Sequence, residues 1–133
     1  MRLPASLRGA LYATGGLVAA SGSLWLVVHD GSRRLAVACI EVHGVTAMAL
    51  LVLIGAAAAL HVPTGWRERR NRASGAILST ALIVLVATGA VLYYAGDDVA
   101  RNAASVAHWT VGLAAVALAG LHVWLGRRGA RAD

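Results

Sequence analysis

The chain has 133 residues, of which 59% are apolar, and it contains neither phenylalanine nor lysine. This apolar excess shifts the expectation from a soluble domain to a membrane protein of one compact unit. The net charge of +6 does not indicate a nucleic-acid partner, because the arginines that produce it flank the apolar runs and are explained by helix orientation.

Four stretches are long enough to cross a bilayer, since a spanning helix needs about 20 mainly apolar residues. The predicted spans are about 7–28, 35–62, 73–95 and 100–126. The breaks between them are short and polar, with the sequences HDGSRR, PTGWRERRN and GDD. Connections this short make successive helices antiparallel neighbours. The sequence predicts an all-α fold, an integral membrane four-helix bundle with up-down-up-down topology, as one domain over residues 1–133.

The first span is expected to be a retained helix and not a cleaved signal peptide. Arg2 and Arg8 precede it, and residues 18–20 could pass for a cleavage site, but the apolar run continues to Val28. His29 follows directly. We expect an interfacial position for it, with substitute ligation or a proton or quinone contact as the alternatives.

The second and fourth spans each carry two histidines on one face. His43 and His61 are eighteen residues apart, which is five helical turns. His108 and His122 are fourteen residues apart and fall within about 40° of each other. Because both spans run in the same direction, we expect His43 level with His108 and His61 level with His122.

Two imidazole pairs at two depths are what two haem b groups require, with each iron held from both sides. With both axial positions filled, the chemistry is one-electron transfer. Headgroup contact explains a single histidine near a helix end equally well, but four matched ones favour haem ligands. At about 1.5 Å per residue, the two histidines of the second span are about 27 Å apart along the helix and those of the fourth span about 21 Å apart. Because these separations differ, the inner pair, His61 with His122, fits less well than the outer pair.

The third span has no histidine but carries Gly75 and Gly89, fourteen residues apart and nearly on one face. Glycines there would let a flat macrocycle approach the backbone at two depths, although glycine also mediates ordinary helix packing in membranes. The single cysteine, Cys39, excludes an intramolecular disulfide and a CxxCH haem attachment site. We expect it to be buried as a small apolar residue.

Nine of the twelve arginines lie on one side of the predicted bundle. They are Arg2, Arg8, Arg67, Arg69, Arg70, Arg72, Arg127, Arg128 and Arg131. The positive-inside rule therefore predicts a multi-pass membrane protein with both termini in the cytoplasm.

Three further segments are distinctive: HVPTGWRERRNRASG from His61, ATGAVLYYAGDDVAR in and after the third span, and AHWTVGLAAVALAGLHVWLGRR in the fourth. Their main features are Thr88-Gly89 followed by 92–94 (LYY), and two histidines in the fourth span ahead of 126–128 (GRR). In these features the chain resembles the bacterial cytochrome b561-like proteins of the inner membrane, which are related to the cytochrome b subunits of hydrogenases and formate dehydrogenases. The resemblance covers the last three spans.

This resemblance implies two b-type haems that pass electrons between a quinone pool and a redox partner. His108 and His122 carry over best. Several relatives take a ligand from the cytoplasmic end of the first helix, where this chain offers only Arg8, Leu11 and Tyr12, so His61 would have to replace it.

Three functions follow as hypotheses. The first is a dihaem electron-transfer protein in membrane lipid, with quinone and a periplasmic redox protein or a larger oxidoreductase complex as partners, alone or as a homodimer. The second is a stand-alone quinone-linked oxidoreductase of the superoxide oxidase type. The third is a haem-free transporter or assembly factor that uses its histidines for protons or metal.

Overall fold

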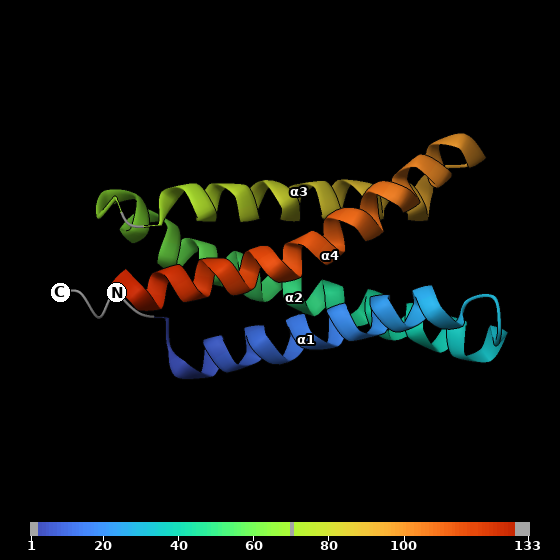
Figure 1. Ribbon diagram of the computed structural model, residues 1–133, viewed down its shortest axis with the longest axis horizontal. Helices are drawn as coiled ribbons and strands as arrows, with labels where there is room; N and C mark the ends of the chain where they lie inside the picture. The colour runs from blue at the N-terminus through green and yellow to red at the C-terminus, as the bar shows by residue number, and fades with distance from the viewer. Residues whose placement is uncertain (1–2, 70, 130–133) are drawn as a thin grey trace. The chain divides into compact units, whose positions relative to one another are not determined.

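The computed structural model describes residues 3–69 and 71–129, which contain four helices and no strand. The helices are α1 (Ala5–Val28), α2 (Arg33–Arg67), α3 (Arg72–Tyr94) and α4 (Asp98–Gly129) (Figure 1). The predicted all-α class is confirmed, and all four helices are long and apolar enough to cross a membrane. Three of the arginines used to predict orientation lie outside the described residues: Arg2, Arg70 and Arg131.

The chain forms two compact units, Met1–Glu68 and Arg69–Asp133. Each unit is a hairpin of two antiparallel helices, α1 with α2 and α3 with α4 (Figure 1). The short polar breaks found in the sequence account for both hairpins. The assembly of the two hairpins into one four-helix domain stays a prediction.

In the first hairpin, α1 begins directly after Pro4, where a residue without a backbone N–H is tolerated. The helix ends at Val28, and the turn is closed by hydrogen bonds from the N–H groups of Gly31 and Ser32 to the Val28 carbonyl, at 3.1 and 3.0 Å. Ser32 is extended and α2 starts at the next residue.

α2 is longer than the predicted span, because the helix continues through Pro63 to Arg67. A proline inside a helix removes one backbone hydrogen bond and costs about 3 kcal/mol in a helix interior. Pro63 lies only four residues before the helix end, and beyond it the N–H of Glu68 bonds to the Thr64 carbonyl at 2.9 Å. His61 therefore lies inside α2, and the proline does not end the helix.

In the second hairpin, α3 follows Asn71, which has a left-handed backbone with φ of 55°. Asparagine tolerates this conformation better than most residues. At the other turn, the Asp97 carboxylate accepts a hydrogen bond from the backbone N–H of Ala100 at 2.7 Å. Asp97 thus caps the start of α4, as aspartate does at many helix N-termini.

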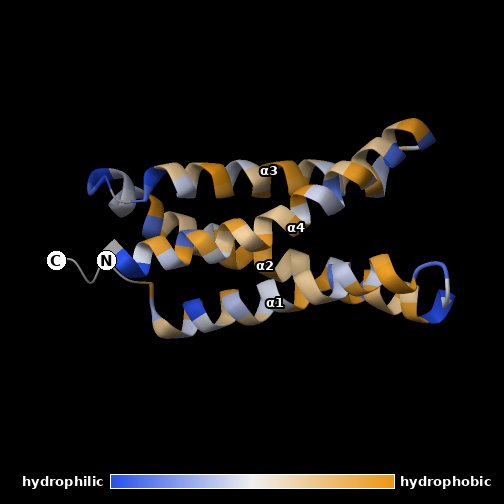
Figure 2. Ribbon diagram, in the orientation of Figure 1, coloured by the Kyte–Doolittle hydropathy of each residue, from blue (hydrophilic) through white to orange (hydrophobic). Residues whose placement is uncertain are grey.

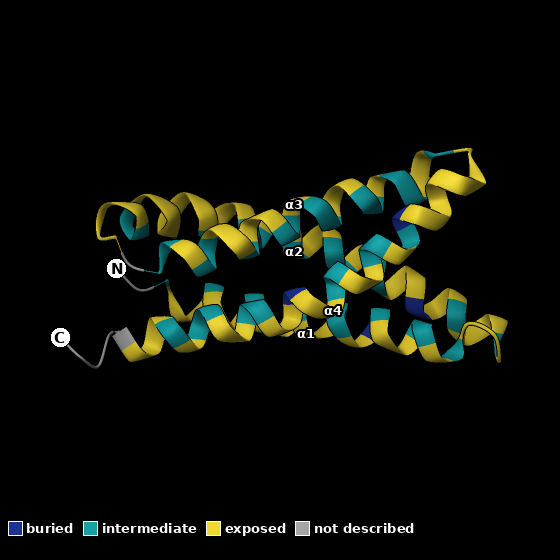
Figure 3. Cartoon of the chain, turned by 45° about the horizontal axis from the view of Figure 1, so that its top comes forward, coloured by how far each residue is buried: buried dark blue, intermediate teal, exposed yellow. Residues whose placement is uncertain are grey.

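Most apolar side chains of the described residues remain exposed, and Figure 3 shows exposed residues along all four helices. Figure 2 shows hydrophobic residues on every helix, interspersed with more polar ones. Val27, Val45 and Val52 are 79%, 73% and 74% exposed. The buried residues are small, and those described are Ser21, Cys39, Ala104 and Ala115. The expectation that Cys39 is buried is confirmed. Small residues at the helix contact let the backbones approach closely, as in membrane helix pairs.

Candidate functional site

His108 on α4 is held by a hydroxyl group of α3. Its Nδ1 lies 2.9 Å from the Thr88 Oγ1. The Thr88 hydroxyl donates its own proton to the Val84 carbonyl at 2.8 Å. The Thr88 oxygen therefore accepts the bond from His108, which places the proton of a neutral imidazole on Nδ1.

His122, the next histidine along the same helix face, has an equivalent environment. Its Nδ1 lies 3.0 Å from the Ser74 Oγ, and the Ser74 hydroxyl donates to the Asn71 carbonyl at 3.2 Å. The Asn71 side-chain amide also donates to the His122 backbone carbonyl at 2.9 Å. His122 is thus held by α3 through both its ring and its backbone.

The two histidines of α4 share one antiparallel register with α3. Ser74 and Thr88 are fourteen residues apart, as are His122 and His108. Because both imidazoles bond to α3, both lie on the side of α4 that faces α3, which is consistent with the spacing argument. At about 1.5 Å per residue, the two positions are about 21 Å apart along the helix.

His43 on α2 is held by α1 in a related way. Its Nδ1 donates to the Val18 carbonyl at 3.0 Å, since a carbonyl can only accept, and the Ser21 Oγ lies 3.5 Å from the same nitrogen. The Ser21 hydroxyl donates to the Leu17 carbonyl at 2.7 Å within α1. The Nδ1–H tautomer is again the one that the hydrogen bonds favour.

His61 lies in a different setting. It is exposed and sits two residues before Pro63 in α2. His61 is eighteen positions after His43, so continuing the antiparallel register of the first hairpin places His61 near Leu3 and Pro4, where α1 begins.

His29 lies at the C-terminal end of α1, the end position that the sequence predicts for it. Its ring stacks on Trp25, with centroids 4.7 Å apart and planes at 22°, and its Nε2 lies 3.4 Å from the Asp30 carboxylate. Trp25 and His29 line an open groove of about 260 Å³ on the first hairpin. The groove is lined by Trp25, His29, Arg33, Ala36, Val37, Ile40 and Glu41.

The two glycines that the sequence suggested for macrocycle contact face the histidines of α4. A Cβ added at Gly75 would lie 3.5 Å from the His122 Cε1, and one added at Gly89 would lie 3.5 Å from the His108 Cε1. The imidazole rings therefore lie against the α3 backbone at these positions. Contact between either glycine and a haem stays a prediction.

These side chains have the chemistry that haem ligation needs. With the proton on Nδ1, the lone pair of a neutral imidazole is on Nε2, and the hydrogen bond at Nδ1 orients the ring and makes it more basic. Among the described residues, no three His, Cys, Asp or Glu side chains gather as a chelating cluster. Haem needs no such cluster, because the porphyrin supplies four ligands and each imidazole supplies one.

Comparisons with protein-family models, with curated proteins and with solved structures give no match for this chain. The pairing of His43 with His108 and of His61 with His122 joins the two hairpins, and it stays a prediction. The observed chemistry is that of three imidazoles, each fixed within its own hairpin by a neighbouring helix.

Sequence reasoning missed the residues that fix these rings. Ser21, Ser74 and Asn71 were assigned no role, and Thr88 entered only as part of a family motif. A signal was present, because Ser21, Ser74 and Thr88 each stand directly before a glycine. The antiparallel register that brings them level with the histidines is set by the turns, which sequence spacing alone does not give.

Proposed function

We propose that this chain is a dihaem b-type cytochrome, similar to the cytochrome b561-like proteins, that transfers electrons across the bacterial inner membrane. One observation carries the proposal. His43, His108 and His122 each have Nδ1 in a hydrogen bond to the neighbouring helix of their own hairpin. This is the arrangement that metal-ligating histidines use to present Nε2 to a metal.

In this proposal, each haem takes one imidazole from α2 and one from α4. His43 and His108 hold the outer haem, and His61 and His122 hold the inner haem. Haem held by these histidines would supply one-electron transfer. The chain positions the rings, sets their basicity through Nδ1 and shields the cofactors from water.

The membrane setting of the proposal is supported by the four long apolar helices and their exposed apolar side chains. The arginine distribution favours cytoplasmic termini. The proposed partners are lipid, the quinone pool and a periplasmic redox protein or a larger oxidoreductase complex.

The test is haem stoichiometry after loss of one ligand. Purified wild-type protein is expected to show a b-type α-band on reduction and two haems per chain. His108→Ala is expected to lose one of the two haems, because His108 is a proposed ligand of the outer haem alone. The variant is expected to keep its helical circular dichroism. Pyridine haemochrome assay against protein concentration measures the ratio.

His29→Ala is the matched control, since His29 is also a histidine near a helix end but is not a proposed ligand. This variant is expected to keep both haems. Wild-type protein without an α-band, or a His108→Ala variant with unchanged stoichiometry, would contradict the proposal.

A further inference from the structure

One local arrangement occurs three times in the two hairpins: a hydroxyl residue, followed by a glycine, opposite a histidine of the antiparallel helix. The three hydroxyl–glycine pairs are Ser21-Gly22 facing His43, Ser74-Gly75 facing His122 and Thr88-Gly89 facing His108. Alanine precedes each pair, so the three sites share a short sequence pattern as well as a geometry.

Within each pair the two residues have separate roles. The hydroxyl oxygen lies 3.5, 3.0 and 2.9 Å from Nδ1 at Ser21, Ser74 and Thr88. The glycine lies against the ring: an added Cβ would be tight at Gly22, 3.0 Å from the His43 Cε1, and in ordinary contact at Gly75 and Gly89, 3.5 Å from the Cε1 of His122 and His108. The ring is therefore confined by contact on one side and by a hydrogen bond at Nδ1.

The dipeptide alone does not produce this arrangement. Thr14-Gly15 in α1 has the same sequence pattern, but the register of the first hairpin places it level with Leu50 of α2. The Thr14 hydroxyl bonds to the Ala10 carbonyl at 2.8 Å, and nothing lies within 4 Å of a Cβ added at Gly15. A histidine opposite the pair is the additional requirement.

We propose that Ser74 and Thr88 are positioning residues that hold His122 and His108 in the Nδ1–H tautomer and thereby lower the reduction potentials of the two haems, with Ser21 assisting the Val18 carbonyl at His43. The inference rests on the proposed function. A hydrogen bond from Nδ1–H raises the basicity of Nε2, which stabilises ferric more than ferrous iron. Loss of the acceptor therefore raises the potential.

Thr88→Val tests this directly, because valine has nearly the volume of threonine but no hydroxyl. Redox titration of the purified protein is expected to show a higher reduction potential for one haem. The expected rise is ~28 to 59 mV, which for a one-electron couple is a threefold to tenfold larger equilibrium constant for reduction. Ser74→Ala is expected to shift the other haem. Thr88→Ser, which restores a hydroxyl, is expected to return the potential toward that of the wild type.

Thr80→Val is the matched control. Thr80 is exposed on the same helix, and its hydroxyl donates to the Ala76 carbonyl of that helix at 3.0 Å. It is expected to leave both potentials unchanged. Unchanged potentials in Thr88→Val with both haems present would overturn the positioning role and leave the proposed function standing.

Nitrogen-15 NMR of the imidazoles in the haem-free protein separates the two proposals. Wild-type His108 is expected to show the Nδ1–H tautomer, and Thr88→Val is expected to lose that preference. Wild-type protein that never binds haem would overturn the proposed function. A tautomer unaffected by Thr88→Val would overturn the positioning role.

Discussion

The three glycines beside the histidines do not tolerate a side chain equally. At Gly22 an added Cβ would lie 3.0 Å from both Cε1 and Nδ1 of His43, which is closer than ordinary van der Waals contact. At Gly89 the nearest ring atom of His108 would be 3.5 Å away, which is ordinary contact distance. The His43 ring is also fixed by its bond to the Val18 carbonyl, so it has little freedom to move away.

Gly22→Ala is therefore expected to destabilise the protein by about 1–3 kcal/mol through overpacking against His43. Gly89→Ala is expected to be neutral or stabilising by about 0.5–1 kcal/mol, because alanine favours the helix more than glycine does. Denaturant unfolding in detergent micelles, followed by circular dichroism, measures both. Equal effects of the two substitutions would contradict the difference in space around these residues.

The start of α3 is joined to α4 by Asn71, which serves two purposes at once. Its backbone adopts the left-handed conformation that precedes the helix, and its amide donates to the His122 carbonyl. The amide nitrogen also lies 3.4 Å from the position of a Cβ at Gly126. The turn and the histidine on the opposite helix are thus coupled through one residue.

Asn71→Ala is expected to cost about 2–3 kcal/mol, which combines about 1–2 kcal/mol of left-handed strain with about 1 kcal/mol for the lost hydrogen bond. Asn71→Gly removes the amide but accepts the backbone conformation, so it is expected to cost only about 1 kcal/mol. Thermal unfolding of the two variants measures the difference. If Asn71→Gly is as destabilising as Asn71→Ala, backbone strain contributes nothing.

Sequence patterns predicted the helices well because apolar runs and polar breaks are local. α1, α3 and α4 begin and end within three residues of the predicted spans. The end of α2 differed, since Pro63 is accommodated close to the helix end instead of terminating it. The face shared by His108 and His122 followed from the 3.6-residue period, whereas the partners of their rings depend on the register of the hairpin and had to come from the structure.

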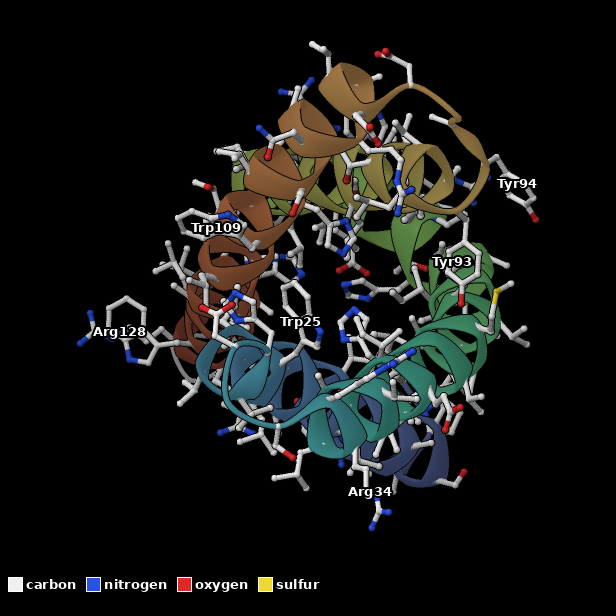
Figure 4. The ribbon with its side chains drawn as sticks, turned by 90° about the vertical axis from the view of Figure 1, so that its right-hand side faces the viewer. Trp25, Arg34, Tyr93, Tyr94, Trp109 and Arg128 are labelled. Atoms are coloured by element: carbon white, nitrogen blue, oxygen red, sulfur yellow. The ribbon has the colours of Figure 1, made fainter. Side chains whose placement is uncertain are left out.

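Charge and apolar surface are distributed over the chain in a way that suits a bilayer. Arginines cluster at the helix ends, and Figure 4 shows Arg34 and Arg128 projecting away from the ribbon. The Arg128 guanidinium lies 3.8 Å from the centre of the Trp124 ring, a pairing of cation and aromatic residue that is common near membrane surfaces.

This distribution predicts the orientation of the chain. A reporter that is active only in the cytoplasm is expected to function when fused after residue 129, and to fail when inserted in the 95–97 turn. A periplasmic reporter is expected to show the opposite pattern, because most arginines adjoin the termini and the α2–α3 turn. The same result at both positions would place them on one side of the membrane, which excludes the single crossing by α4 and with it the predicted topology.

If the chain spans a bilayer as proposed, the length of α2 would exceed the thickness of the hydrocarbon layer. Its 35 residues span about 52 Å, whereas the hydrocarbon layer is about 30 Å thick. Tilts of up to about 40° shorten the projected length to about 40 Å, so roughly 10 Å must still stand among headgroups or in water. In the proposed membrane setting, the tilt of this helix, and with it the depth of the imidazoles it carries, would change with bilayer thickness.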